Sequence, residues 1–299
     1  MGVSWTVQAC PPAGVSAEDM RVAAQAAVNS IVRQMSSWEP ESDLCHFNRS
    51  PTGSWHDLPA DFAAVVDRAL YWASESDGAF DPTVGRLTEL WGFGAAGSAL
   101  ETPTGQTLDS LQSQSGWRRL ERRGEALLQP GGLDLDLSGI AKGFGVDAVM
   151  AALQGLGVRH ALVEIGGELR GEGVRPDGQP WWVQIEAPPG LSAAEPIVIA
   201  LHGLSLATSG DYRRFRMDSG RRRSHTLDPR TGAPVEAAAA SVSVLARTCM
   251  DADALCTVLM VLGPEAGMDW ATARSVAACW RLRDGSERMT PAFAAMLDD

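Results

Sequence analysis

One stretch of the sequence predicts how the chain is organised: Leu133-Asp134-Leu135-Asp136-Leu137-Ser138-Gly139-Ile140-Ala141-Lys142-Gly143-Phe144-Gly145-Val146-Asp147. Leucine and aspartate alternate over its first five residues, which predicts a short strand with both carboxylates on one face. Apolar side chains then follow at helical spacing as far as residue 156, and Gly157 marks the end of that helix. The stretch therefore predicts a strand, a short turn and a helix.

Lys142 is the only lysine in the chain, since every other member of the 25 Lys and Arg residues is arginine. An ammonium is a compact charge whose pKa responds to burial, whereas a guanidinium stays charged. Either this position requires an ammonium, or one lysine remains by chance on a solvated helix face. The count alone leaves both interpretations open.

The carboxylate of Asp136 lies one short turn before the predicted helix. The free N–H groups and the dipole at a helix N-terminus attract anions, and Gly139 would allow close approach to the backbone. With Lys142 in the first helical turn, the stretch is typical of a phosphate or cofactor site. If the polar face of the strand is solvated instead, its acids are ordinary edge charges.

The composition restricts the class of protein. The chain has 299 residues, of which 45% are hydrophobic and 21% charged, as in an ordinary globular protein. Its net charge of −12 disfavours nucleic acid or an anionic membrane as partner. Five cysteines without zinc-ligand spacing predict free, mostly buried thiols and a reducing compartment.

The sequence was also compared with the patterns of secretory leaders and membrane-spanning segments. The first residues show neither the basic nor the apolar region of a secretory leader, and no apolar run approaches the roughly 18 residues of a membrane span. We therefore expect no transmembrane segment and a cytoplasmic location, or a periplasmic or exported one if a leader was removed.

The patterns along the chain predict an α+β fold in a single compact domain over residues 1–299, with mixed or antiparallel sheets and packed helices. No repeat or low-complexity linker divides the sequence. The predicted helices cover residues 16–37, 59–73, 140–156, 250–262 and 290–297. The predicted strands cover residues 5–8, 127–129, 133–137, 161–165, 181–186, 196–201, 204–207, 241–246 and 277–282. Residues 38–48 and 95–106 are predicted to be loops.

A second candidate site lies on the helix that begins near residue 250. Asp253 and Thr257 are four residues apart and therefore share a helix face. A carboxylate and a hydroxyl oxygen suit Mg²⁺, which prefers hard oxygen ligands. The alternative is an ordinary helix N-terminus where the dipole favours acidic residues.

His225 precedes Asp228-Pro229-Arg230-Thr231-Gly232, a stretch with strong turn chemistry. The histidine is therefore expected at the end of a strand, facing a loop. A histidine there can act as a general base near neutral pH, or it can be a hydrogen-bonded structural group.

Aromatic residues in loops are candidates for binding a flat ring. Trp38, or Phe80 in the loop Phe80-Asp81-Pro82-Thr83, could stack on a heteroaromatic ring, and Asp81 could accept hydrogen bonds from ring or ribose donors. With ten tryptophans in the chain, any single one can equally be part of the packing. Rossmann and P-loop motifs are absent from the sequence.

Taken in order, these segments resemble the ApbE family, the FAD:protein FMN transferases, over most of the chain. The matching segments are Met1-Gly2 with Trp5, and residues 38–48, 78–94, 136–147, 163–173, 207–212, 225–234 and 241–263. The resemblance implies an ApbE-like fold related to the T-fold, and a Mg²⁺-dependent enzyme that cleaves FAD. Such an enzyme moves FMN onto a Thr or Ser hydroxyl of an acceptor protein through a phosphoester bond and releases AMP.

The resemblance also implies which residues form the site. The family's metal ligands fall on Asp253, Thr257 and the backbone oxygen of Gly139, and its proposed catalytic base falls on His225. Asp253 is expected to act in catalysis through the metal. The FAD contacts fall on Met1, Trp38, Ala79, Phe80, Asp81, Asp136, Lys142 and Leu227.

Two alternatives to flavin transfer stay open. Water could replace the acceptor hydroxyl, which would make the protein a Mg²⁺-dependent FAD pyrophosphatase that yields FMN and AMP. The protein could also bind FAD without turnover. Trp38 bears on this choice because it stands where the family often has a tyrosine or another residue, and it would flank the flavin.

Overall fold

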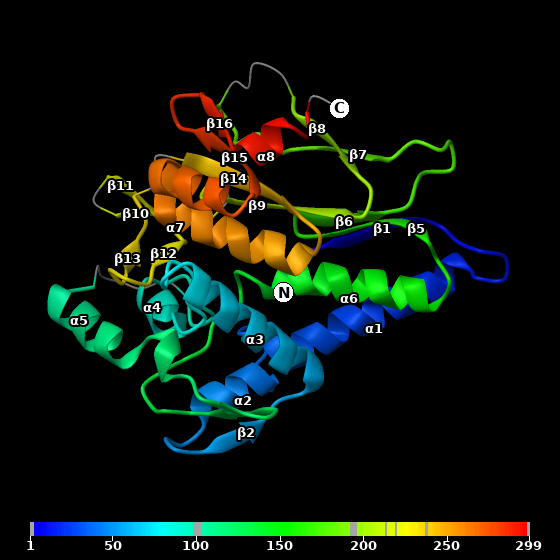
Figure 1. Cartoon of the computed structure of the whole chain (residues 1–299). Helices are drawn as coiled ribbons and strands as arrows, with labels where there is room; N and C mark the ends of the chain where they lie inside the picture. The colour runs from blue at the N-terminus through cyan, green and yellow to red at the C-terminus, as the bar shows by residue number, and fades with distance from the viewer. Residues whose placement is uncertain are drawn as a thin grey trace. The chain divides into compact units, whose positions relative to one another are not determined.

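The computed structural model describes residues 3–97, 103–191, 196–212, 214–218, 220–236 and 239–297 (Figure 1). The chain divides into two compact units. The first unit comprises Met1–Ser30, Ile140–Tyr212 and Ala237–Asp299, and the second comprises Ile31–Gly139 and Arg213–Glu236. Helices and antiparallel sheets confirm the α+β class. A single domain over residues 1–299 stays a prediction.

A seven-stranded sheet forms the centre of the first unit, and every pairing in it is antiparallel. Its order is β1-β5-β6-β9-β14-β15-β16. The strands are β1 (Trp5–Cys10), β5 (His160–Ile165), β6 (Glu168–Glu172), β9 (Leu204–Gly210), β14 (Ala239–Ala246), β15 (Ala277–Leu282) and β16 (Glu287–Met289). Five of them begin within a few residues of a predicted strand, whereas β6 and β16 were not predicted.

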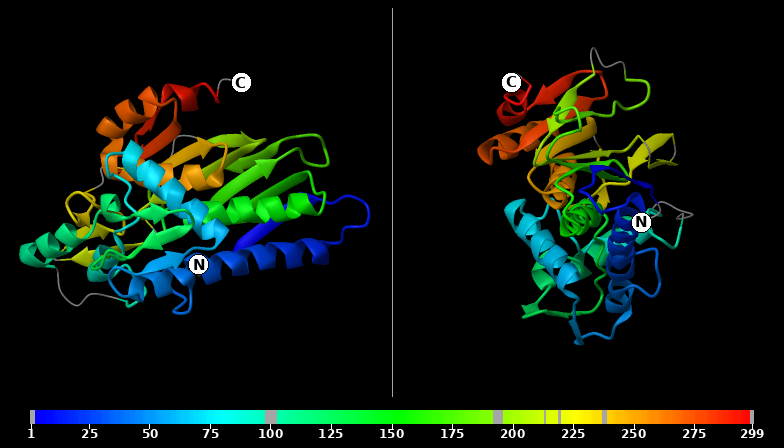
Figure 2. Two further views of the ribbon diagram at one scale, coloured as in Figure 1. Left: turned by 60° about the horizontal axis from the view of Figure 1, so that its bottom comes forward. Right: turned by 90° about the vertical axis from the view of Figure 1, so that its right-hand side faces the viewer.

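Helices cover one face of this sheet: α6 (Ala141–Gly155), α7 (Cys249–Ala273) and the N-terminal part of α1 (Ala17–Met35). Alternate residues of β5 point into this layer, so Ala161 and Val163 pack with Val149 and Leu153 of α6. Ala24 of α1 belongs to the same cluster, and Figure 2 shows this part of α1 running beside α6. The apolar residues that recur at helical spacing in the sequence lie on the face that each helix buries.

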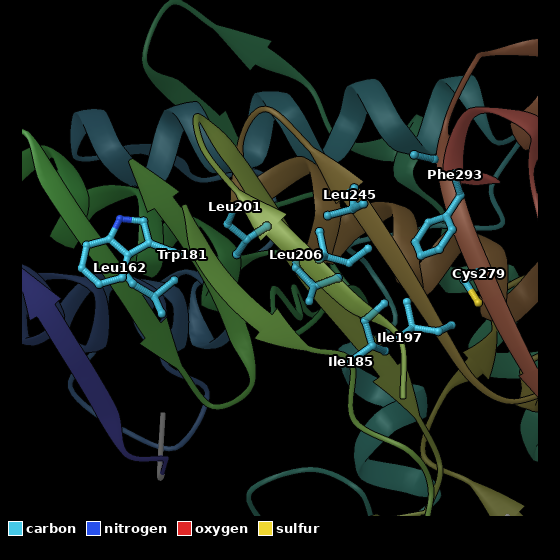
Figure 3. Packing of buried hydrophobic residues seen from close by; sticks show 11 residues of the cluster. Leu162, Trp181, Ile185, Ile197, Leu201, Leu206, Leu245, Cys279 and Phe293 are labelled. Atoms are coloured by element: carbon cyan, nitrogen blue, oxygen red, sulfur yellow. The ribbon is translucent and has the colours of Figure 1, made fainter. Parts of the chain in front are cut away.

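The other face is covered by α8 (Pro291–Ala294) and by a ribbon of β7 (Trp181–Gln184) and β8 (Val198–Leu201). Figure 3 shows their side chains meeting the sheet, with Trp181 beside Leu162 and Leu201 beside Leu206. Leu162 joins this cluster, although its neighbours Ala161 and Val163 face the helices. The sheet is therefore buried on both faces, which explains why β5 reads as a continuous apolar run.

The helices α6 and α7 approach closely at Gly143. A Cβ atom there would lie 2.2 Å from the carbonyl oxygen of Cys249. The carboxylate of Asp147 accepts hydrogen bonds from the N–H groups of Cys249, at 3.1 Å, and Met250, at 2.9 Å. An acid on α6 therefore caps the first turn of α7 and fixes how the two helices cross.

The ends of α1 and α7 follow the expected capping rules. Ser16 and Asp19 form a reciprocal capping box, with hydrogen bonds of 2.9 and 3.1 Å. Residues 250–262 were predicted to be helical, and α7 does change direction at Gly263, whose φ is +74°. A second helical segment then continues to Ala273, because Pro264 can begin a helix although it cannot continue one.

The second unit contains α2 (Asp43–Arg49), α3 (Ala60–Glu75), α4 (Gly85–Leu90), α5 (Gly105–Gln114) and the 3₁₀ turn η1 (Trp117–Arg119). Its strands are short: β2 (Trp55–Asp57), β3 (Arg122–Arg123), β4 (Ala126–Leu128), β10 (Phe215–Asp218), β11 (Arg221–Ser224), β12 (Leu227–Asp228) and β13 (Ala233–Pro234). Of these elements, α3 and β4 were predicted by their residue ranges, and β11 only as the strand expected to end at His225. Of the predicted loop at 95–106, residues 98–102 lie outside the described residues, and α5 begins at Gly105.

Two predictions for this unit were wrong. Residues 38–48 were expected to be a loop, but Ser42 caps α2 by accepting a hydrogen bond from the Cys45 N–H at 3.0 Å. A helix of seven residues is too short to show a periodic apolar face. Residues 133–137 do not form a ladder, and their one bridge joins Asp134 to Val84 in parallel.

The alternation in residues 133–137 nevertheless has its predicted consequence. Leu133, Leu135 and Leu137 are buried, whereas the two aspartates between them are partly exposed. The segment is held by a side chain instead of a neighbouring strand. Asn48 accepts a hydrogen bond from the Leu135 N–H at 2.8 Å and donates one to the Leu135 carbonyl at 3.0 Å.

Two other expectations can be compared with the structure. All five cysteines are free thiols, and Cys249, Cys256 and Cys279 are buried, as predicted. Among the residues that the structure describes, no helix combines the length and the apolar character needed to cross a membrane.

Replacing Gly143 by alanine should lower the free energy of unfolding by about 2–3 kcal/mol, because its methyl group overlaps the backbone of α7. Gly155→Ala is the matched control on the same helix, where a Cβ atom meets nothing within 4 Å. It should raise stability by about 0.5 kcal/mol. Urea unfolding measures both variants, and equal effects would show that the close approach at Gly143 is not what stabilises this crossing.

Candidate functional site

Three charged side chains of the first unit meet where α6 begins. Lys142, in the first turn of α6, places its ammonium in contact with Oε1 of Glu168, the first residue of β6. The same nitrogen lies 3.9 Å from Oδ1 of Asp253 on α7. Glu168 and Asp253 are each only 2% exposed, and the lysine side chain is 31% exposed. The only lysine of the chain therefore lies between two buried carboxylates.

Burial and charge compete in this cluster. Burial raises the pKa of Glu168 to about 7 against the opposing effect of the Lys142 charge. Burial also raises the pKa of Asp253, although Lys142 and the N–H of Gly143 favour the carboxylate. Desolvation opposes the charge on Lys142, but Asp253 and Glu168 outweigh it and raise the pKa of the ammonium. One cation between two carboxylates leaves a negative charge, so the cluster favours uptake of a proton or a second cation.

The donor atoms near Asp253 fit Mg²⁺. The Gly143 N–H holds Oδ2 of Asp253 at 2.9 Å, while Oδ1 lies beyond hydrogen-bonding distance of Lys142. Thr257 lies one turn further along α7 and is partly exposed, so the helix supplies a carboxylate and a hydroxyl oxygen. Both are hard ligands of the kind Mg²⁺ prefers. Within the described residues, no group of three or more His, Cys, Asp or Glu side chains could hold a metal.

In the second unit, two of the predicted segments lie together. The N–H of Asp136 donates to the Pro82 carbonyl at 2.8 Å, directly after Ala79-Phe80-Asp81. The Asp136 carboxylate accepts hydrogen bonds from the Thr88 hydroxyl at 3.0 Å and the Ser138 N–H at 2.8 Å. Its side chain is therefore fixed in a partly exposed position beside the loop at residues 79–83.

Asp81 organises that loop. One oxygen accepts from the N–H of Thr83 at 2.8 Å and from its hydroxyl at 2.7 Å. The other accepts from the Trp117 N–H at 3.0 Å. Burial raises the pKa of Asp81, although these hydrogen bonds favour the carboxylate. A ligand would have to share oxygens that already bind the protein.

His225 directly follows β11, as the sequence predicted. Its Nδ1 lies 2.9 Å from the carbonyl oxygen of Arg214. A carbonyl can only accept, so Nδ1 carries the proton and Nε2 carries the lone pair of the neutral imidazole. This tautomer suits a general base. The turn at 228–232 is also present, with the Gly232 N–H donating to the Asp228 carbonyl at 2.8 Å.

Trp38 shares a neighbour with His225. Trp38 is 57% exposed, and the Arg214 guanidinium lies 5.8 Å from the centroid of its ring. Phe93 meets the His225 ring edge to face at 6.4 Å and packs with Leu227 in one apolar cluster. The structure thus brings Trp38, His225 and Leu227 into one neighbourhood of the second unit.

The predicted residues therefore form groups within each unit. Lys142, Asp253 and Thr257 belong to the first unit, whereas Gly139 is the last residue of the Ile31–Gly139 segment of the second unit. Met1 lies outside the described residues. Sequence reasoning missed Glu168, although it follows the pair Gly166-Gly167 at the end of a predicted buried strand. It is 26 residues from Lys142, and only the packing of β6 against α6 brings them together.

The chain is similar to known proteins along its length. The sequence profile described as the ApbE family matches residues 1–280. The FAD:protein FMN transferase of Vibrio cholerae is 35% identical over 278 residues, which span 92% of this chain and 83% of that relative. The apo form of the flavinyl transferase ApbE of Pseudomonas stutzeri superposes with a TM-score of 0.91 at 36% identity, over 99% of this chain and 93% of that one. The ApbE protein of Thermotoga maritima reaches a TM-score of 0.86 at 26% identity, over 100% and 97% of the two chains.

A double-mutant cycle should show strong coupling between Lys142 and Glu168. Lys142→Met and Glu168→Leu should each lower the free energy of unfolding by about 3 kcal/mol, because each leaves buried charge without its partner. The double variant should lose much less than the sum of the two. Urea unfolding provides all three values.

The exposed pair Arg288–Glu265, at 2.8 Å, is the control for this cycle, and its coupling should stay below about 1 kcal/mol. If the losses of unfolding free energy for the Lys142 and Glu168 variants are additive, the two side chains do not interact as a buried ion pair.

Proposed function

The chain belongs to the ApbE family and transfers FMN from FAD to an acceptor protein, and we propose that Mg²⁺ is required and AMP is released. The acceptor group is a Thr or Ser hydroxyl, which becomes the phosphoester of FMN. The observation that carries this proposal is the arrangement of Lys142, Glu168 and Asp253, with Thr257 on the same helix as Asp253. Its excess negative charge and hard oxygen atoms favour a divalent cation.

The reaction exchanges one phosphorus–oxygen bond for another. The acceptor oxygen attacks the phosphorus of the FMN half of FAD, and the bond to the AMP oxygen breaks. His225 is assigned as the base that takes the hydroxyl proton at Nε2, because the Arg214 carbonyl fixes its tautomer. Mg²⁺ held by Asp253, Thr257 and the Gly139 carbonyl would stabilise charge on the phosphate oxygens.

We assign FAD contacts to the residues that the family resemblance implies. Lys142 is suited to phosphate because its ammonium is compact and charged. Trp38 is the better candidate for stacking on the flavin, since Phe80 is only 3% exposed and belongs to the buried core. Asp136 and Asp81, which hold two neighbouring loops in place, are also assigned as FAD contacts. Ala79, Leu227 and Met1 complete the set of proposed FAD-binding residues.

Two alternative functions follow from the same residues. If water replaces the acceptor hydroxyl, the protein is an FAD pyrophosphatase, and if no bond breaks, it is an FAD-binding protein. The cytoplasmic location, or the exported one after removal of a leader, likewise stays a prediction.

The family resemblance suggests an acceptor stretch like Ser-Gly-Ala-Thr. Purified protein supplied with FAD, Mg²⁺ and a peptide containing that stretch should release AMP and add one FMN to the peptide mass. AMP and free FMN without an acceptor would indicate hydrolysis, and bound FAD without AMP would indicate storage. EDTA should abolish turnover, and added Mg²⁺ should restore it. If EDTA leaves the rate unchanged, the magnesium proposal is wrong.

The Asp253→Ala variant should have no turnover and no response to Mg²⁺, because this carboxylate is the charged ligand of the proposed metal site. The variant protein should still fold. Glu265→Ala is a matched control, since Glu265 also lies on α7 but is 73% exposed. Initial AMP release over a range of Mg²⁺ concentrations compares the variants. A rate equal to that of the control would remove Asp253 from the metal site.

Lys142→Arg should impair use of FAD more than stability, with kcat/KM for FAD lower by about tenfold or more. A planar guanidinium cannot occupy the space of an ammonium in contact with Glu168 and still present the same charge to phosphate. Steady-state kinetics and thermal unfolding of the same preparation separate the two effects. An unchanged kcat/KM would indicate that this position does not require an ammonium and that the lysine remains there by chance.

A further inference from the structure

The strands β10 and β11 form a separate two-stranded ribbon in the second unit (Figure 1). Residues 213–223, which include β10 and the first three residues of β11, contain six arginines and one aspartate in sequence, whereas the whole chain has a net charge of −12. The segment is therefore strongly positive within an acidic protein. We call the two strands β10 and β11 the basic ribbon.

Two arginines of the basic ribbon face each other across the strands. Arg216 is paired directly with Arg223 in the antiparallel register. Like charges in that position destabilise a ribbon. The Arg223 side chain donates to Asp218 at 3.3 Å, whereas the side chain of Arg216 makes no hydrogen bond or ion pair with the part of the chain that the structure describes. A carboxylate from another molecule would relieve this repulsion.

The opposite face of the ribbon is apolar and exposed. Phe215 and Met217 alternate with Arg216 along β10, and they are 43% and 59% exposed. The Arg222 guanidinium lies 3.8 Å from the centroid of the Phe215 ring. Exposed aromatic, methionine and arginine side chains are the types enriched at protein interfaces.

The basic ribbon leads directly to the assigned base. Ser224 ends β11 and His225 follows it, while the carbonyl of Arg214, next to the start of β10, accepts the Nδ1 hydrogen bond of His225. A segment bound along the ribbon would therefore lie beside the residue assigned to the acceptor hydroxyl.

We propose that the basic ribbon is the docking surface for an acidic segment of the acceptor protein, which it recognises by carboxylate side chains. This inference rests on the proposed transfer to a hydroxyl of an acceptor protein. A short acidic segment meets the positive ribbon, whereas a long anionic polymer or a membrane would also meet the acidic remainder of the chain. The exposed Phe215 and Met217 give the segment apolar contacts that phosphate groups could not use.

Two peptides of equal length test the proposal, each with a central Ser-Gly-Ala-Thr and with either glutamates or lysines on both sides. Fluorescence anisotropy of labelled peptides measures binding without turnover, and AMP release measures transfer. The wild-type protein should prefer the glutamate peptide at low salt, and 0.5 M NaCl should largely remove that preference.

Arg216→Glu should lower the affinity for the glutamate peptide by about tenfold and improve binding of the lysine peptide. The same change should raise the melting temperature, because it replaces a repulsive cross-strand pair by an attractive one. If Arg216 only stabilised the ribbon, Arg216→Glu would lower both the melting temperature and the affinity for the glutamate peptide. FAD affinity should not change.

Arg175→Glu is the matched control, because it makes the same charge change at an exposed loop of the first unit. If both variants weaken peptide binding equally, or neither does, the docking proposal is wrong. Capture of anionic vesicles in preference to the glutamate peptide would also overturn it. Peptide binding without any AMP release would instead contradict the proposed function and leave the docking surface supported.

Discussion

The close approach of α6 and α7 at Gly143 is the constraint on which the first unit depends. Without a side chain there, the Gly143 N–H can donate to Asp253 while the carbonyl of Cys249 passes close by. Asp147 adds two hydrogen bonds to the first turn of α7 and fixes the crossing from the other side. The same contact that packs two helices therefore places Lys142, Asp253 and Glu168 together.

Charge is distributed unevenly in this protein, and the unevenness corresponds to its assigned roles. In the first unit, two buried carboxylates outnumber one ammonium, and the resulting negative charge favours a cation. In the second unit, six arginines gather within eleven residues of an otherwise acidic sequence. Clusters of like charge lower the stability of a folded protein. They are therefore expected where a ligand or partner supplies the opposite charge.

The second unit is held largely by bonds from side chains to backbone groups. Asn48 takes the place of a neighbouring strand for Leu135, Asp81 joins its loop to residue 117, and Asp136 joins the same loop to α4. Such bonds give a loop one conformation without a regular pattern of apolar residues. This explains why its short helices and two-residue strands were not predicted, whereas the amphipathic helix α3 was.

The sequence by itself determined the α+β class, the long helices and the buried strands, because apolar periodicity records which face of each element is buried. It also identified Lys142, Asp253 and His225 as candidates by residue type, and the ordered segments identified the family. Only the tertiary structure paired Lys142 with Glu168, assigned the proton of His225 to Nδ1 and placed Arg216 opposite Arg223. These are contacts between residues distant in the chain, or a register between strands, and no local pattern of side chains encodes them.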